Sequence, residues 1–292
     1  MNEERDKQEA EERSSPSAHV VYEAIRREGR HELERKASAL AWSGLAAGMS
    51  MGFSFLTQAL LRTYLPDAAW TPLVTKLGYA VGFLIVILGR QQLFTENTLT
   101  VILPLLLHKT RHDLVKVARL WTVVFLANLA GAFAFAWVAA RTGAFAPEFH
   151  PALDTIATES TAESFGLNLL RGVFAGWLIA LMVWLLPAAE SARIWVIVIV
   201  TYVIGLGHFP HIVAGSVEAF YCGINGLRTW GEVLGRYELP TLIGNTIGGV
   251  TLVAVLAHAQ IVGDKEKEKE KEPLLVRPGP PGAGVGPADD ER

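Results

Sequence analysis

The distribution of charge along this 292-residue chain leaves few folds open. Residues 1–36 and 263–292 are rich in charged side chains, whereas the region between them contains nearly charge-free blocks of about 20 residues, the length that an α-helix needs to cross a bilayer. With 51% hydrophobic residues, the sequence therefore predicts an all-α membrane protein. We expect a charged cytoplasmic segment at 1–36, a transmembrane domain at 37–262 and a disordered charged tail at 263–292.

The apolar blocks predict six transmembrane segments. They cover about residues 37–61, 73–107, 120–140, 167–186, 194–222 and 239–262. Polar residues at 90–98 interrupt the second segment, and neither apolar half of it is long enough to cross a bilayer alone. The second segment therefore has the length of one span plus an inserted loop.

The fifth segment is interrupted by the stretch Gly205-Leu206-Gly207-His208-Phe209-Pro210-His211. Proline removes a backbone donor and clashes with the preceding helical turn, and glycine weakens a helix. An imidazole placed in hydrocarbon needs a partner or a water-filled cavity. This stretch predicts a helix that is broken at mid-membrane and faces a pore.

The ends and loops of the chain give its orientation. Residues 19–37 predict a helix that either lies at the membrane surface or leads, solvated, into the first span. Lys and Arg are concentrated before the first span and between the second and third, which places both termini in the cytoplasm. We expect no cleavable signal peptide, and the single Cys222 excludes an internal disulfide and a cysteine-based structural zinc site.

The two halves of the membrane region repeat the same pattern. Residues 44–48 (GLAAG) correspond to 172–176 (GVFAG), and residues 128–131 (NLAG) correspond to 245–248 (NTIG). The two interrupted segments lie between these motifs. Three spans per half give the halves opposite orientations, and paired broken helices in an inverted repeat indicate a transport site at the repeat interface. Asn128 and Asn245 are expected to hold backbone at helix contacts.

The residues at these positions resemble the formate/nitrite transporter family. The matching motifs are Leu93-Phe94-Thr95 with Asn97, Gly207-His208, Asn245-x-x-Gly248-Gly249, and the spacing from Gly172 to Trp184. The resemblance covers about residues 35–262 and is greatest to a divergent inner-membrane branch. It implies an aquaporin-like fold, a homopentamer with one pore per protomer, and permeation of small monovalent anions such as formate or nitrite, or of their neutral acids.

The resemblance also implies a set of pore residues. Thr95 matches the family's loop threonine, and His208 matches its central pore histidine. Apolar constrictions are expected at Leu93, Phe94, Tyr79 and Phe83, and His211 is a further pore candidate. We expect the Thr95 hydroxyl to hydrogen-bond His208 across the pore and to set its tautomer.

A histidine at mid-membrane supports a specific chemistry. As a cation it attracts an anion, and as a proton donor it converts a weak-acid anion into a neutral acid that passes an apolar gate. Burial disfavours its charged form and an approaching anion favours it, so proton transfer follows substrate arrival. The sequence leaves open whether this is a channel or a proton-coupled transporter.

Two departures from the family pattern keep other functions open. Gly176 stands where the family usually has an asparagine, and residues 157–161 (ATEST) lack the lysine expected before the fourth span. A neutral small-solute pore is therefore one alternative, and a membrane scaffold with a closed pore is another. The sequence predicts no enzyme, cofactor, metal site or nucleic-acid partner, and places the chain in the bacterial inner membrane.

Overall fold

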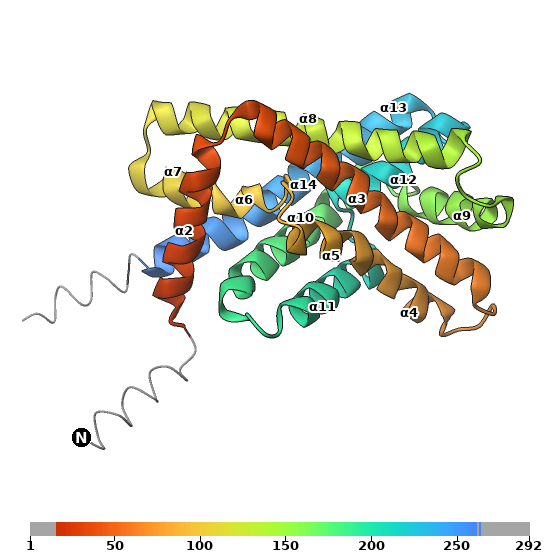
Figure 1. Ribbon diagram of the computed structural model, residues 1–292, viewed down its shortest axis with the longest axis horizontal. Coiled ribbons are helices and arrows are strands. Elements are labelled where there is room, and N and C mark those ends of the chain that lie inside the picture. Colours follow the sequence, from red (N-terminus) through yellow and green to blue (C-terminus); the bar gives the residue numbers. More distant parts are fainter. Residues whose placement is uncertain (1–15, 262, 264–292) are drawn as a thin grey trace, which may run out of the picture.

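The computed structural model describes residues 16–261 and residue 263 (Figure 1). These residues form helices and connecting loops, with no strand among them, which confirms the predicted all-α class. Expectations for the extreme ends, the start of the leader and the charged tail, fall outside the described residues.

Four helices, packed as two pairs, build the frame. They are α3 (Ala37–Tyr64), α8 (Arg111–Arg141), α10 (Phe165–Leu185) and α14 (Leu239–Gly249), the last continued by the π-helical turns η5 (Val250–Val255). Between and around them lie α2 (Ala18–Glu34), α4 (Thr71–Thr75), η1 (Lys76–Tyr79), α5 (Ala80–Leu88), α6 (Asn97–Thr100), α7 (Ile102–His108), η2 (Pro147–Phe149), α9 (His150–Ser160), η3 (Leu186–Ala188), α11 (Arg193–Leu206), α12 (Ile212–Asn225), α13 (Trp230–Glu232) and η4 (Val233–Glu238).

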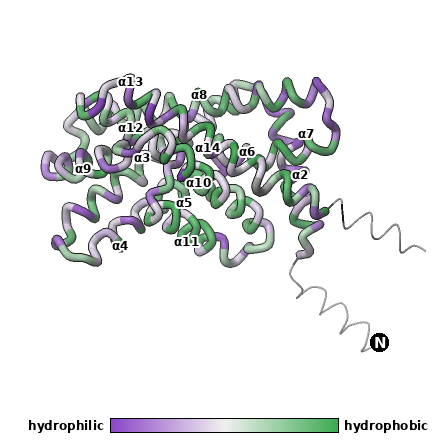
Figure 2. The backbone as a smooth tube through the Cα atoms, turned by 180° about the vertical axis from the view of Figure 1, so that it is seen from behind, coloured by the Kyte–Doolittle hydropathy of each residue, from purple (hydrophilic) through white to green (hydrophobic). Residues whose placement is uncertain are grey.

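Several of these helices have the length and composition to cross a membrane. Within the described residues, four helical stretches are long and apolar enough, and two shorter helical stretches are also apolar. The four are Ala37–Tyr64, Thr71–Leu88, Arg111–Arg141 and Phe165–Ala188, and the two shorter ones are Asn97–His108 and Arg193–Leu206. Figure 2 shows hydrophobic residues along these helices and hydrophilic residues at the turn between α7 and α8.

Small residues let the long helices pack backbone against backbone. α3 packs along α8, and α10 packs along α14 (Figure 1). A Cβ added at Gly48 would overlap the carbonyl oxygen of Asn128, and a Cβ added at Gly176 would overlap that of Asn245. Gly48 and Gly176 belong to the small-residue motifs that correspond between the two halves of the sequence. In each half the glycine packs against the backbone of the corresponding asparagine.

The N-terminal helix packs on the protein itself. Val21, Tyr22 and Ile25 of α2 are buried, and α2 contacts α6 and α7. Gly29 allows this approach, because a Cβ there would overlap the carbonyl oxygen of Thr100. Neither sequence-based alternative, a helix on the membrane surface or a solvated helix, anticipates this packing, since the surface that covers α2 comes from distant parts of the chain.

The connection after α8 contains a helix that the sequence did not predict. α9 packs against α3 and α12, with Leu153, Ile156 and Ala157 buried. The apolar face of α9 is short and lies among acidic residues, so the sequence pattern indicates a polar connection and not a packed helix. α9 closes one side of the site described below.

The close contact at Gly176 predicts that a larger side chain there destabilises the protein. Gly176→Ala places a methyl group against rigid backbone of α14, and overpacking of this kind costs about 1–3 kcal/mol. We expect a lower thermal midpoint in detergent. The matched control on the same helix is Gly166→Ala, which has open space around its Cβ position. Equal midpoints for the two variants would contradict the proposed packing.

Candidate functional site

The site is built around two places where a helix stops inside the protein and another begins. The first break, residues 89–96, joins α5 to α6, and the second break, residues 207–211, joins α11 to α12. Arg90 and His208 are both left-handed, each with φ of 49°, and each follows a glycine. This conformation costs energy in a residue with a Cβ, so it persists only where the surroundings fix it.

The two breaks end their helices in the same way. The Gln91 N–H donates to the carbonyl of Val86 at 2.9 Å, and the Phe209 N–H donates to that of Ile204 at 3.1 Å. In each case the residue after a left-handed residue donates to a carbonyl in the last helical turn. Hydrogen bonds of this kind commonly end α-helices. The similarity extends the repeat from the long helices to the breaks.

Two asparagines hold the breaks in place. Asn128 donates to the carbonyls of Gly44 and Gln92, both at 2.8 Å, and its Oδ1 accepts from the Phe94 N–H at 2.9 Å. Each of these bonds fixes backbone, and the asparagine itself is fully buried. The sequence-based expectation that it holds backbone at a helix contact is confirmed.

The second asparagine makes the same three bonds. Asn245 donates to the carbonyls of Gly172 and Pro210, both at 2.9 Å, and accepts from the Ile212 N–H at 2.8 Å. Phe94 and Ile212 are therefore equivalent in the two halves. The residues that precede them, Leu93 and His211, are equivalent as well.

The histidine at the centre is His211. It is buried, and its Nε2 lies 2.7 Å from the Oγ1 of Thr95 in the first break. Its Nδ1 accepts from the Ala214 N–H at 3.2 Å, so the neutral ring carries its proton on Nε2 and donates to Thr95. The predicted hydrogen bond between Thr95 and His208 is wrong, since His211 takes that position.

His208 lies elsewhere. It is exposed, and its left-handed backbone directs the chain out of α11 at the edge of a cavity of about 340 Å³. Sequence reasoning favoured it because it follows Gly207 directly. The spacing to the asparagines did not choose between the histidines, because Leu93 lies 35 residues before Asn128 (128 − 93) and His211 lies 34 residues before Asn245 (245 − 211).

Aromatic and aliphatic side chains surround the Thr95–His211 pair. The Phe83 ring lies edge-on to the His211 ring with centroids 5.0 Å apart, and Tyr79 lies 5.3 Å from Phe83. Leu93, two residues before Thr95 in the chain, is fully buried. The structure thus brings three candidate constriction residues into the core around this pair.

Phe94, a fourth candidate constriction residue, points in another direction. Its ring packs against Trp121 and Phe125 of α8, with centroids 5.7 and 5.1 Å away. These contacts anchor the first break to α8. The role that Phe94 plays in the structure is therefore packing.

The cavity at His208 also borders His211 and is strongly charged. Its charged lining residues are Lys76, Glu159, Glu163, Arg171 and Glu218. Lys76 reaches it from η1, although the sequence shows no lysine at the position where the family resemblance requires one. Nothing in the sequence indicated this, because Lys76 falls within an apolar segment more than 80 residues away in the chain.

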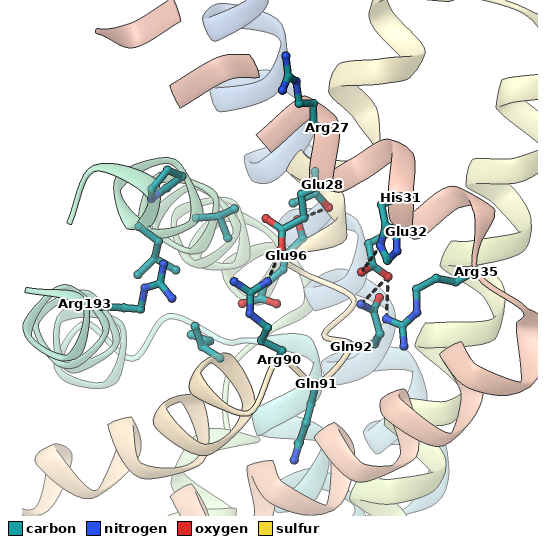
Figure 3. A pocket seen from close by; sticks show the side chains of 15 residues that line it. Arg27, Glu28, His31, Glu32, Arg35, Arg90, Gln91, Gln92, Glu96 and Arg193 are labelled. Atoms are coloured by element: carbon teal, nitrogen blue, oxygen red, sulfur yellow. Dashed lines mark hydrogen bonds and ion pairs between the residues drawn. The ribbon is translucent and has the colours of Figure 1, made fainter. Parts of the chain in front are cut away.

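A second cavity of about 740 Å³ lies on the side of α2 (Figure 3). Residues of the first break, including Gln92 and Glu96, line it together with residues of α2. Gln92 donates to Glu32 at 2.8 Å, and Arg90 pairs with Glu28 at 3.5 Å, so α2 is tied to the first break. His211 lines the cavity at His208, and Thr95 directly precedes Glu96, which lines this one.

Comparisons with known proteins agree with this arrangement. Residues 19–259 match the family model described as formate/nitrite transporter. The chain is 41% identical to the inner membrane protein YfdC of Escherichia coli, over 90% of this chain and 84% of that protein. It is 28% identical to the formate channel BtFdhC of Bacillus thuringiensis, over 81% and 90% of the two chains.

Solved structures share the fold. An FNT family ion channel superposes with a TM-score of 0.73 over 82% of this chain and 98% of its own. A pentameric formate channel with formate bound superposes with a TM-score of 0.65 over 77% and 98%, and both are 18% identical in sequence. With a family model covering most of its length and a relative at 41% identity, the chain belongs to the formate/nitrite transporter family, whose members are transporters and channels and not enzymes.

Proposed function

We propose that this protein is a channel for small monovalent anions, such as formate or nitrite, or for their neutral acids. One observation carries the proposal: the buried hydrogen bond between Thr95 and His211, formed where the two breaks meet. A titratable ring that packs in an apolar core and borders a charged cavity is arranged for a solute that changes its charge on the way. The Bacillus relative named a formate channel supports the choice of anion.

The proposed topology has six spans, with the second and fifth broken. Ala37–Tyr64, Arg111–Arg141 and Phe165–Ala188 supply the first, third and fourth spans. The second span combines Thr71–Leu88 with Asn97–His108, the fifth combines Arg193–Leu206 with α12, and the sixth is α14 with η5. The inverted repeat is supported by the matching bonds of Asn128 and Asn245. Both termini are cytoplasmic in this topology because the basic residues cluster before α3 and between α7 and α8. Assembly as a homopentamer is proposed from the pentameric formate channel that shares the fold.

In the proposed mechanism the anion loses its charge at His211. The ring first takes up a proton from water on Nδ1, which breaks the bond from the Ala214 N–H, and the imidazolium then transfers its Nε2 proton to a carboxylate or nitrite oxygen. This leaves a neutral acid and an imidazole that carries its proton on Nδ1. The neutral acid then passes the apolar surroundings of Phe83 and Leu93, and it releases its proton to water on the other side. The Thr95 hydroxyl, hydrogen-bonded to Nε2, keeps the ring oriented so that Nε2 is the nitrogen that gives up the proton.

Replacing the central histidine tests the proposal. His211→Leu removes the group that compensates or protonates the anion, so we expect formate flux into proteoliposomes to fall at least about tenfold, which corresponds to about 1.4 kcal/mol. The control is His208→Asn, since asparagine tolerates the left-handed conformation. We expect its flux to stay within about twofold of the wild type. Unchanged flux in His211→Leu at every pH would refute the role of His211.

The hydroxyl of Thr95 has a separable effect. Thr95→Val keeps the shape of the side chain and removes one buried hydrogen bond, which is worth about 1 kcal/mol, so formate flux should fall about fivefold. Thr95→Ser retains the hydroxyl and should remain close to the wild type. Equal losses in the valine and serine variants would show that packing, and not the hydrogen bond, matters at this position.

A further inference from the structure

A buried carboxyl group shares the cavity with His211 and has no part in the mechanism above. Glu218 is 6% exposed and lines the 340 Å³ cavity. It lies seven residues after His211 on α12, which places both side chains on one helix face about 10 Å apart along the axis. An ionisable residue at such depth is costly and is therefore a functional candidate.

The helix surface between the two residues is occupied by a hydroxyl group. Gly215 lies one turn after His211, and a Cβ there would overlap the hydroxyl of Tyr237 from η4. Tyr237, Gly215 and Glu218 all border the cavity. A polar surface therefore continues along α12 from His211 to the carboxyl group.

One nearby cation faces this carboxyl group. Glu218 lies beside Gln58 and Ser160 and within the electrostatic range of Lys76. The Lys76 ammonium donates to Gln58 Oε1 at 3.0 Å, so Gln58 stands between the two charges. Other titratable groups near Glu218 come from the segments packed around it: Tyr79 of η1, Glu159 of α9, Tyr237 of η4, and Cys222 of its own helix. Glu238 of η4 faces Tyr237.

The charges that line the cavity are nearly balanced. Two cations, Lys76 and Arg171, face three carboxyl groups, those of Glu159, Glu163 and Glu218. Arg171 is already paired with Glu163 at 2.9 Å. The formal charge of the lining is therefore −1 when Glu218 is ionised and zero when it is protonated. Its protonation state decides whether an approaching anion meets net repulsion.

We propose that Glu218 controls selectivity by carrying a proton: the anion occupies the cavity when Glu218 is protonated and is excluded when Glu218 is ionised. This inference rests on the proposed function and adds a second titratable group to the permeation path. Each entering anion then meets a neutral carboxylic acid in a lining without net formal charge, since Lys76 and Arg171 balance Glu159 and Glu163. Anion flux consequently depends on proton concentration through Glu218 as well as through His211.

The test uses Glu218→Gln, which keeps the shape and polarity of the side chain and is permanently neutral. Formate uptake is measured in proteoliposomes with the same pH on both sides, from about pH 5.5 to about pH 8, with empty liposomes as the blank. We expect flux at the alkaline end to rise about fivefold over the wild type, and flux at the acidic end to stay unchanged. The ratio of acidic to alkaline flux therefore falls.

The matched control is Glu238→Gln. Glu238 is also buried, but it bonds Ser216 at 2.9 Å and does not line the cavity, so its variant should keep the wild-type pH profile. A second variant, Lys76→Gln, removes the opposing cation and should lower flux at every pH about fivefold.

The outcomes separate the two proposals. A wild-type pH profile in Glu218→Gln, or equal flattening in Glu238→Gln, overturns the role of Glu218 and leaves the proposed function intact. Undiminished flux in Lys76→Gln overturns it as well. Absence of formate flux in the wild type overturns the proposed function, and this inference with it.

Discussion

A helix that stops inside a low-dielectric core leaves backbone N–H and carbonyl groups without partners, and in this protein two asparagine side chains supply them. Asn128 and Asn245 each bond three backbone groups, two of them in a break or directly beside it. Each unpaired group of this kind would cost several kcal/mol in hydrocarbon. These six hydrogen bonds allow the chain to run irregularly at this depth, and every feature of the site depends on that irregular path.

The breaks matter because they bring two polar side chains together inside an apolar core. Thr95 and His211 are 116 residues apart in the chain and meet because the Asn128 and Asn245 clamps set the position of each break. The clamps are alike, yet the residues they position differ, since Leu93 occupies in one half the place of His211 in the other. This asymmetry gives the proposed permeation path one titratable ring surrounded by hydrophobic side chains.

In the cavity beside that ring, positive charge is present although the lysine of the family pattern is missing. The position that would supply a lysine holds the acidic and hydroxylic residues of α9, and positive charge comes instead from Lys76 and Arg171. A carboxyl group on α12 opposes them. The electrostatic balance of this surface, and not any single residue, then determines which charged solutes approach His211.

The sequence by itself determined the helical membrane class, the positions of the two breaks and the role of the paired asparagines. These follow from local chemistry: hydrophobic length, the intolerance of helices for glycine and proline, and small residues at fixed spacing. Only the tertiary structure decided that His211 and not His208 meets Thr95, that Phe94 packs on α8, that α2 is covered by α6 and α7, and that Lys76 and Glu218 share a cavity. Each of these depends on the register between segments far apart in the chain. That register is set by the backbone atoms that Gly48, Gly176, Asn128 and Asn245 contact, and local sequence patterns do not specify these partners.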